Sequence, residues 1–317
     1  MHSTEQDDDL APWSFAEPWG GTGHVCDLDG PVHWVDFGGP ADASPIVLVH
    51  GLGGSHLNWV LVASALAQRS RVFALDLPGF GLTTAGHRAA TVQANTAVLD
   101  RFVREITGGP AVLIGNSMGG MISLLEADAR PASVAGLVLI DPSLPVPRQL
   151  PDRQIASQFL IYAVPFFGER YLASNRRKLT DRQLVQRVID LCFADPSRAS
   201  GELLDTAAAL VGQRRTMPAQ EAAFMQAARS LMRVLARPRR YQALMNRLDL
   251  PVLLVHGDRD RLVPVSAARA TLAANPRWEG VILPGVGHTA QLESPDAVIE
   301  HVTRWLDRHE LALPSTS

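Results

Sequence analysis

Short apolar runs alternate with stretches of helical periodicity from about residue 45 onward. Each run is about four residues long, rich in Val, Ile or Leu, and bounded near its end by Gly, Asp or Pro. The runs lie at 46–49, 72–75, 111–114, 137–140, 252–255 and 281–283, and helical patterns lie near 57–68, 91–106, 118–129, 265–274 and 295–309. Continuous apolar runs are typical of strands buried on both faces. The alternation therefore predicts an α/β fold, with helices on both faces of a mostly parallel central sheet.

Two intervals depart from this alternation. Segments 24–28 and 32–37 flank Asp29-Gly30-Pro31, which predicts an antiparallel hairpin at the sheet edge. Between 143 and 248 the strand pattern stops, and amphipathic helices are predicted, including 155–164, 183–193, 200–211 and 220–235. Because strand patterns resume at Pro251, we expect one core, residues 22–142 and 249–317, with an inserted helical cap at 143–248. Residues 1–21 are expected to be a loosely held end.

Composition excludes several broad classes of protein. With 317 residues, 46% of them apolar, the chain can bury a sizeable core, and wholesale disorder is excluded. No run of about 18 apolar residues occurs, so no membrane span is expected. The start of the chain has neither a basic segment nor an apolar stretch, and its two cysteines, Cys26 and Cys192, are far apart in sequence. These features favour a reducing, cytoplasmic environment over secretion.

The net charge of −3 conceals an asymmetry along the chain. Residues 143–249 carry 17 basic and 9 acidic side chains, whereas the rest carries 12 and 23. Basic residues cluster at 176–178, 214–215 and 237–240. The favoured interpretation is that these runs lie on solvated faces and pair with the acidic core. The alternative is attraction of anionic substrates or peripheral contact with a membrane surface. Aromatic residues are not interleaved with the basic ones, so no nucleic-acid partner is expected.

The clearest chemical signal follows run 111–114 and opens the next helical pattern, as Gly115-Asn116-Ser117-Met118-Gly119-Gly120. A nucleophile on a tight strand-to-helix turn needs small neighbours, and Gly115 and Gly119 stand two residues on either side of Ser117. The helix amino terminus also directs N–H groups at charge that develops on an oxygen. An ordinary glycine-rich turn is the alternative interpretation.

Three further motifs stand at the ends of predicted strands. His50-Gly51-Leu52-Gly53-Gly54 follows 46–49, and the backbone N–H groups of Leu52 and Met118 are the expected oxyanion-hole donors. A carboxylate follows 252–255 in the segment His256-Gly257-Asp258-Arg259-Asp260, and an imidazole follows 281–283 in the segment Gly285-Val286-Gly287-His288. Ser, Asp, His is also the chain order of one class of catalytic triads.

Together with Asp76-Leu77-Pro78-Gly79-Phe80-Gly81 and Glu293-Ser294-Pro295, these motifs resemble the α/β-hydrolase superfamily over about residues 22–310. The resemblance implies that Ser117 is the nucleophile, His288 the general base and Asp260 the acid that orients it. Asp141, at the end of run 137–140, is the alternative acid, and Asp258 is interpreted as a turn residue. Serine at the elbow disfavours the dehalogenase and epoxide-hydrolase branches. No metal or organic cofactor is required, and no histidine shows the i, i+4 pairing of a helical zinc site.

The expected function is a serine hydrolase that acts on a small molecule, a carboxylic ester with a substantial apolar portion. Hydrophobic residues expected on the inner face of the cap support the apolar portion: Phe159, Leu160, Phe166, Phe167, Phe224, Met225 and Met232. The first alternative is a carbon–carbon hydrolase of ring-cleavage products, vinylogous diketones, whose elbow is similar. Those enzymes usually carry Trp after the catalytic His, where this chain has Thr289, and a Gly-Pro-Gly element that is absent at 51–54. A non-catalytic small-ligand binding protein is a third hypothesis, disfavoured by the intact Ser, Asp and His.

Overall fold

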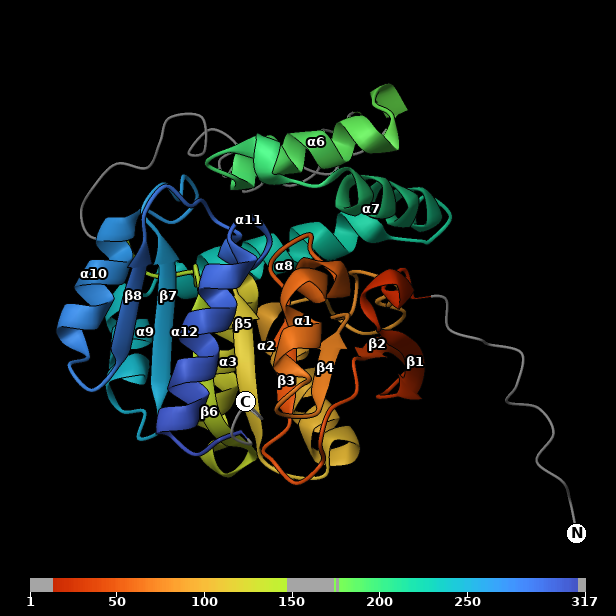
Figure 1. The fold of residues 1–317 in the computed structure, drawn as a ribbon. Helices are drawn as coiled ribbons and strands as arrows, with labels where there is room; N and C mark the ends of the chain where they lie inside the picture. The colour runs from red at the N-terminus through yellow and green to blue at the C-terminus, as the bar shows by residue number, and fades with distance from the viewer. Residues whose placement is uncertain (1–13, 147–173, 175–176, 313–317) are drawn as a thin grey trace, which may run out of the picture.

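The computed structural model describes residues 14–146, 174 and 177–312, and its centre is an eight-stranded sheet (Figure 1). The strand order is β1-β2-β4-β3-β5-β6-β7-β8. The strands are β1 (Thr22–Asp27), β2 (Pro31–Asp36), β3 (Ile46–Val49), β4 (Val72–Leu75), β5 (Ala111–Asn116), β6 (Val134–Ile140), β7 (Val252–Gly257) and β8 (Glu279–Leu283). The neighbours from β4 to β8 are parallel, and β1 and β2 form an antiparallel hairpin at one edge. The predicted strands, the hairpin and the mostly parallel sheet are confirmed.

Helices cover both faces of this sheet (Figure 1). They are α1 (Val60–Leu66), α2 (Val92–Phe102), α3 (Met118–Ala129), α10 (Val265–Ala274), α11 (Ala290–Glu293) and α12 (Pro295–Arg308). Shorter turns are η1 (Glu17–Trp19), η2 (His56–Trp59), η3 (Val103–Thr107), η4 (Pro131–Ser133) and η5 (Pro196–Arg198). Alternate residues of β3 point to opposite faces: Val47 and Val49 pack in the core with α2 and α3, and Ile46 and Leu48 with α1 and α12. This two-sided burial explains why the strand runs are continuously apolar.

The described part of the interval between β6 and β7 is mainly helical, and its helices do not form one separate layer. Its described helices are α6 (Asp181–Cys192), α7 (Gly201–Arg214), α8 (Gln220–Leu235) and α9 (Pro238–Asn246). Helices α6 and α7 lie beyond the carboxyl ends of the strands, whereas α9 lies beside the sheet (Figure 1). Leu231 of α8 and Tyr241 and Leu244 of α9 belong to the same core cluster as the sheet. Helices α8 and α9 therefore pack with the sheet, and the predicted helix 155–164 lies outside the described residues.

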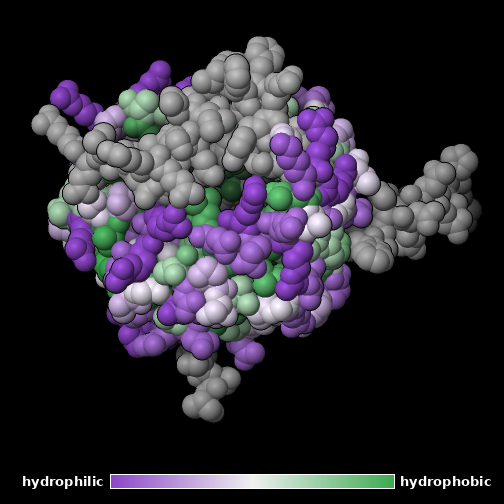
Figure 2. All heavy atoms as spheres, turned by 90° about the horizontal axis from the view of Figure 1, so that it is seen from above, coloured by the Kyte–Doolittle hydropathy of each residue, from purple (hydrophilic) through white to green (hydrophobic). Residues whose placement is uncertain are grey.

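Residues 14–21, the described part of the expected loosely held end, contact the core. Ala16 is fully buried in the core on the α1 side, Phe15 packs against the same cluster, and η1 follows directly. Viewed from above, hydrophobic residues are visible between hydrophilic ones near the centre of this face (Figure 2). Among the described residues, no helix combines the length and apolar character needed to cross a membrane.

Candidate active site

Ser117 stands on a strained turn between β5 and α3. Its φ of 54° and ψ of −115° are uncommon for a residue with a side chain, and the turn is possible because its neighbours are small. A Cβ added at Gly115 would lie 2.6 Å from the carbonyl carbon of Gly119, and one added at Gly119 would lie 2.0 Å from the carbonyl oxygen of Val49. The steric requirement predicted for both glycines is therefore confirmed.

The neighbours of Ser117 come from β6 and from the loop after β8. The Ser117 hydroxyl lies 3.5 Å from the Ser143 hydroxyl, and the Ser117 N–H donates to the carbonyl of Ile140 at 3.1 Å. Asn116 donates its side-chain amide to the carbonyl of His288 at 3.0 Å, so the elbow and the histidine loop are in direct contact. Within the described residues, no hydrogen bond joins the side chains of Ser117 and His288. Catalytic hydrogen bonds are often absent before substrate binds.

His288 and Asp260 form a buried pair. Nδ1 of His288 lies 2.7 Å from Oδ2 of Asp260, and Oδ1 of Asp260 accepts the backbone N–H groups of Leu262 at 2.8 Å and Val263 at 2.9 Å. Burial by itself lowers the pKa of His288, but the charge and hydrogen bond of Asp260, together with the charge of Asp141, outweigh it and raise this pKa above its ordinary value. The pair therefore stabilises the protonated imidazole, as a general base requires.

Asp141 lies close to this pair but binds other groups. Its two oxygens accept the backbone N–H groups of Gly257 at 2.8 Å and Ala290 at 3.2 Å. Burial raises the pKa of Asp141 to about 6. Asp258 accepts the N–H of Gly285 at 2.7 Å, a contact that holds the turn. Of the two candidate acids, Asp260 is the one that the structure brings to the imidazole.

The expected oxyanion-hole residues come from the start of α3 and from a loop close to Ser117. Met118 is the first residue of α3, where N–H groups have no partner within the helix. The loop that carries Leu52 is close, since a Cβ at Gly51 would lie 3.1 Å from the Cβ of Ser117. Phe224 of α8 covers this loop, because a Cβ at Gly53 would lie 3.2 Å from its ring.

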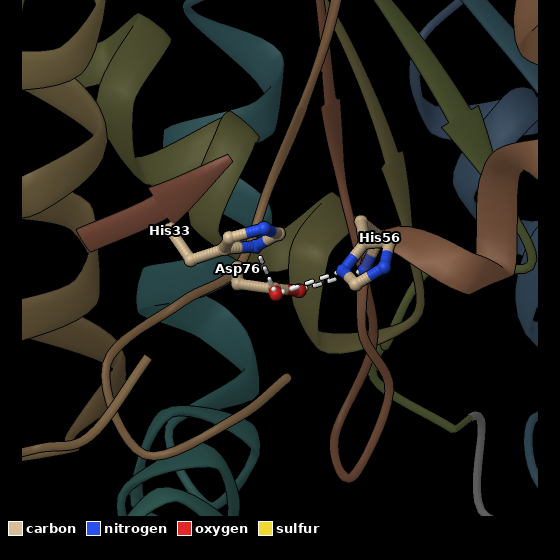
Figure 3. Close-up of side chains that lie close together, drawn as sticks. All are labelled: His33, His56 and Asp76. Carbon is tan, nitrogen blue, oxygen red and sulfur yellow. Dashed lines mark hydrogen bonds and ion pairs between the residues drawn. The ribbon is translucent and has the colours of Figure 1, made fainter. Parts of the chain in front are cut away.

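Figure 3 shows a second buried cluster, in which His33 and His56 both face Asp76. Nδ1 of each histidine lies 2.8 Å from Oδ2 of Asp76. Burial by itself raises the pKa of Asp76, but the charges and hydrogen bonds of the two imidazoles outweigh it and hold this pKa well below its usual range. The N–H groups of His56 and Leu82 also donate to this carboxylate. A Cβ at Gly81, where φ is 51°, would lie 2.0 Å from the carboxylate. The motif that begins at Asp76 is therefore hydrogen-bonded to both ends of the loop that carries Leu52, through His50 and His56.

Two groups of side chains have spacings that a metal ion could use: His33, His56 and Asp76, and Asp141 with His256 and Asp260. In the first, the nitrogen–oxygen distances of 2.8 Å are those of direct hydrogen bonds, and backbone N–H groups bind the same carboxylate. In the second, backbone N–H groups likewise bind both carboxylates. Hydrogen bonding explains both groups.

Glu293 is a supporting residue whose role the sequence did not reveal. Its buried carboxylate accepts the N–H of Gly287 at 2.7 Å, beside His288, and those of Ala194 at 3.0 Å and Asp195 at 2.8 Å, after α6. The N–H of His288 donates to the carbonyl of Cys192 at 2.6 Å. The histidine loop is thus bound to the segment that follows α6. The only signal in the sequence was the position of Glu293 in a family motif.

The basic runs have different partners. Arg214 donates to the carbonyls of Gly79 and Gly81, and Arg215 pairs with Asp181 at 2.6 Å. Arg247, outside the predicted runs, pairs with Asp128 of α3. Of these contacts, only that of Arg247 joins a carboxylate of the core, so the expected pairing of the basic runs with the acidic core stays a prediction.

The sequence profile of the alpha/beta hydrolase family matches residues 46–301. This chain belongs to that family. The match agrees with the sheet and its crossovers, and the predicted α/β-hydrolase fold is confirmed. The solved structure of a putative lipase from Acinetobacter baumannii has the same fold, with a TM-score of 0.75 and 23% identity over 94% of this chain and 97% of that one.

The relatives of this hydrolase have several activities. The dihydrolipoyllysine-residue acetyltransferase component of the acetoin cleaving system of Pseudomonas putida is 29% identical over 280 residues, 88% of this chain and 67% of that protein. This chain covers 64% of the Cupriavidus necator protein of the same name, so it spans about two thirds of these relatives. A 2-hydroxy-6-oxo-6-(2'-aminophenyl)hexa-2,4-dienoic acid hydrolase from Metapseudomonas resinovorans is 26% identical over 277 residues, 83% of this chain and 84% of that protein. Lipases and esterases also occur among the relatives and structural neighbours.

Proposed function

We propose that this alpha/beta hydrolase is a serine hydrolase that cleaves a carboxylic ester with a substantial apolar portion. The observation that carries the proposal is the strained turn at Ser117, which holds a hydroxyl beside the loop of a buried His288–Asp260 pair. Strain of this kind persists only where the surroundings enforce it, and it clusters at functional sites. Lipases and esterases among the relatives and neighbours agree with this activity class.

The chemistry proceeds through a covalent acyl-enzyme. Nε2 of His288 takes the proton of Ser117 as the serine oxygen bonds to the ester carbonyl carbon. The carbonyl oxygen becomes an oxyanion, stabilised by the N–H groups of Leu52 and Met118 at about 3 kcal/mol per donor. The carbon–oxygen bond to the alcohol then breaks, and the alcohol leaves with the proton from His288. Water then attacks the acyl-enzyme by the same steps, with His288 as base, which releases the carboxylic acid and restores Ser117.

An apolar substrate portion is supported by the residues around the oxyanion loop. Leu52 and Phe224 are both partly buried hydrophobic residues that pack against the core, and Phe224 lies against Gly53 of the loop. Because Phe224 comes from α8, we assign the segment from α6 to α8 as the cap over the site. Burial of each substrate methylene there would contribute up to about 0.8 kcal/mol.

The proposal is tested by fluorophosphonate labelling with peptide mapping, combined with hydrolysis of p-nitrophenyl acetate, butyrate and octanoate. We expect the label on Ser117, and we expect Ser117→Ala to lower kcat/KM by about 10⁴-fold or more. Ser143→Ala is the matched control, because its hydroxyl lies 3.5 Å away and should leave labelling intact. A folded protein that takes no label, or one in which Ser117→Ala retains activity, would show that Ser117 is not the nucleophile.

Carbon–carbon bond hydrolysis is the second candidate, favoured by the Metapseudomonas resinovorans relative, which covers 83% of this chain. Thr289 counts against it, since the related enzymes usually have Trp at this position. The two activities are separated by comparing kcat/KM for p-nitrophenyl butyrate with kcat/KM for a 2-hydroxy-6-oxohexa-2,4-dienoic acid. A larger value for the dienoic acid would replace the ester proposal.

A further inference from the structure

A pocket of about 330 Å³ lies between α2, α3, α8 and α9, and none of Ser117, Asp260 and His288 lines it. Its size falls at the lower end of the range for small-molecule sites, about 300–1,000 Å³. It lies among the helices that cover one side of the sheet, and Tyr241 forms part of its floor. Neither the family match nor the catalytic chemistry accounts for this pocket.

Four arginines line the pocket, and among the described residues three of them have no anionic partner. Arg247 pairs with Asp128, which is the one carboxylate that the described residues contribute to the lining. The side chains of Arg233, Arg237 and Arg240 are exposed, and the described part of the chain provides none of these three guanidinium groups with a hydrogen bond or ion pair. Three guanidinium groups that share one pocket repel each other. This arrangement is explained if an anion occupies the pocket.

The start of α9 adds positive potential at the same place. This helix begins at Pro238, directly after Arg237, and no side chain caps its amino terminus. The N–H groups of Arg239 and Arg240, in the first turn, therefore have no partner within the helix. A helix amino terminus carries about half a positive charge, which favours an oxyanion.

The remaining lining is partly apolar. Leu125 of α3, Val234 of α8 and Leu244 of α9 line the pocket together with Tyr241. The Tyr241 hydroxyl is already bound to the carbonyl of Ser143 at 3.1 Å, so the pocket meets mainly its ring. The ligand should consequently combine an anionic group with an apolar one.

We propose that this pocket binds an organic phosphate, with its phosphate group on Arg233, Arg237 and Arg240 and its apolar part on Val234 and Leu244. A carboxylate is satisfied by one bidentate guanidinium, whereas three unpaired guanidinium groups match the larger charge and the three oxygens of a phosphate monoester. The site is separate from the catalytic residues, so the proposal does not depend on the ester hydrolysis.

The experiment is isothermal titration calorimetry of the full chain with butyl phosphate and with inorganic phosphate, at constant low ionic strength. We expect butyl phosphate to bind several-fold more tightly, because its chain buries methylenes on the apolar residues. The double variant Arg237→Gln/Arg240→Gln should bind butyl phosphate at least about tenfold more weakly, since it lacks two charged hydrogen-bonding groups. Arg239→Gln is the matched control, because Arg239 is exposed in the same run but does not line the pocket, and it should change the affinity less than about twofold.

A further variant separates a built site from general attraction. The double variant Arg237→Lys/Arg240→Lys keeps both charges but lacks the planar guanidinium groups that bind two phosphate oxygens at once, and it should bind butyl phosphate several-fold more weakly. Equal binding by this variant and the wild type, unchanged binding by the glutamine variant, or no binding of butyl phosphate by the folded wild type would each overturn the proposal. Flotation with phosphatidylcholine vesicles, with and without phosphatidic acid, then shows whether the bound phosphate belongs to a lipid headgroup or to a free compound. Arginine-dependent binding to the acidic vesicles indicates a lipid headgroup, and binding to butyl phosphate alone indicates a free phosphate.

Discussion

Substitution of Asp260 by asparagine should abolish most activity through the proton position on His288. Oδ1 of Asp260 accepts two backbone N–H groups, from Leu262 and Val263, whereas Oδ2 faces Nδ1 of His288 at 2.7 Å. In Asp260→Asn the amide oxygen must stay with the two backbone donors, since the opposite orientation would set an NH₂ group against them. The NH₂ group then donates to Nδ1, and the ring proton moves to Nε2. That nitrogen can no longer take the proton of Ser117.

The size of the effect follows from this geometry. Reversing the amide to restore the working tautomer would leave two backbone donors unsatisfied, at about 1–3 kcal/mol each. Loss of the carboxylate charge also removes stabilisation of the imidazolium. We therefore expect a fall in kcat of about 10⁴-fold, which corresponds to about 5.5 kcal/mol, as in triads where the same change traps the wrong tautomer.

The assay is kcat/KM on p-nitrophenyl butyrate, with thermal melting to establish that each variant folds. Asp141→Asn should lower kcat/KM less than about tenfold, because it removes only the longer of two hydrogen bonds to backbone N–H groups, the one at 3.2 Å. Asp258→Asn affects one hydrogen bond within a turn and should lower kcat/KM still less. If folded Asp260→Asn keeps more than a tenth of the activity, or if Asp141→Asn loses as much, Asp260 does not orient the base.

Four further predictions concern pH and stability. The neighbouring carboxylates raise the pKa of His288, and only the neutral imidazole is a base, so kcat/KM should rise with pH with a midpoint above 6.5; a flat profile from pH 5 to 8 would contradict this. Asp76→Asn should lower the free energy of unfolding by about 3–5 kcal/mol in urea melts at pH 7, and an unchanged melt would refute the supporting role of Asp76. The wild type should also be destabilised in acid, because the lowered pKa of Asp76 gives a stabilisation that is complete above the unfolded pKa of about 4 and is lost as the pH falls from there toward the folded pKa. Glu293→Gln should lower the free energy of unfolding by about 2–3 kcal/mol and the melting temperature by several degrees, because the amide NH₂ group of the glutamine must face backbone N–H donors. A melting temperature equal to that of the wild type would contradict the supporting role of Glu293.

The positions that were predicted correctly depend on local rules. Runs such as 111–114 read as strands because a strand buried on both faces must be continuously apolar. The glycines around Ser117 were recognisable because the tight turn excludes a Cβ within a few residues of sequence. The same reasoning predicted helices in this interval but did not delimit α9, since an arginine-rich start hides the apolar face that Tyr241 and Leu244 turn toward the core.

By itself the sequence determined the sheet, the order of its helices and the candidate nucleophile, base and oxyanion loop, because each is encoded within a few neighbouring residues. Only the tertiary structure decided which carboxylate meets His288, since Asp141 and Asp260 end adjacent strands and loop conformation alone separates them. The tertiary structure likewise brought Glu293 to the segment after α6 and gathered three arginines in one pocket. These contacts join residues far apart in sequence, where no local periodicity or spacing can specify the partner.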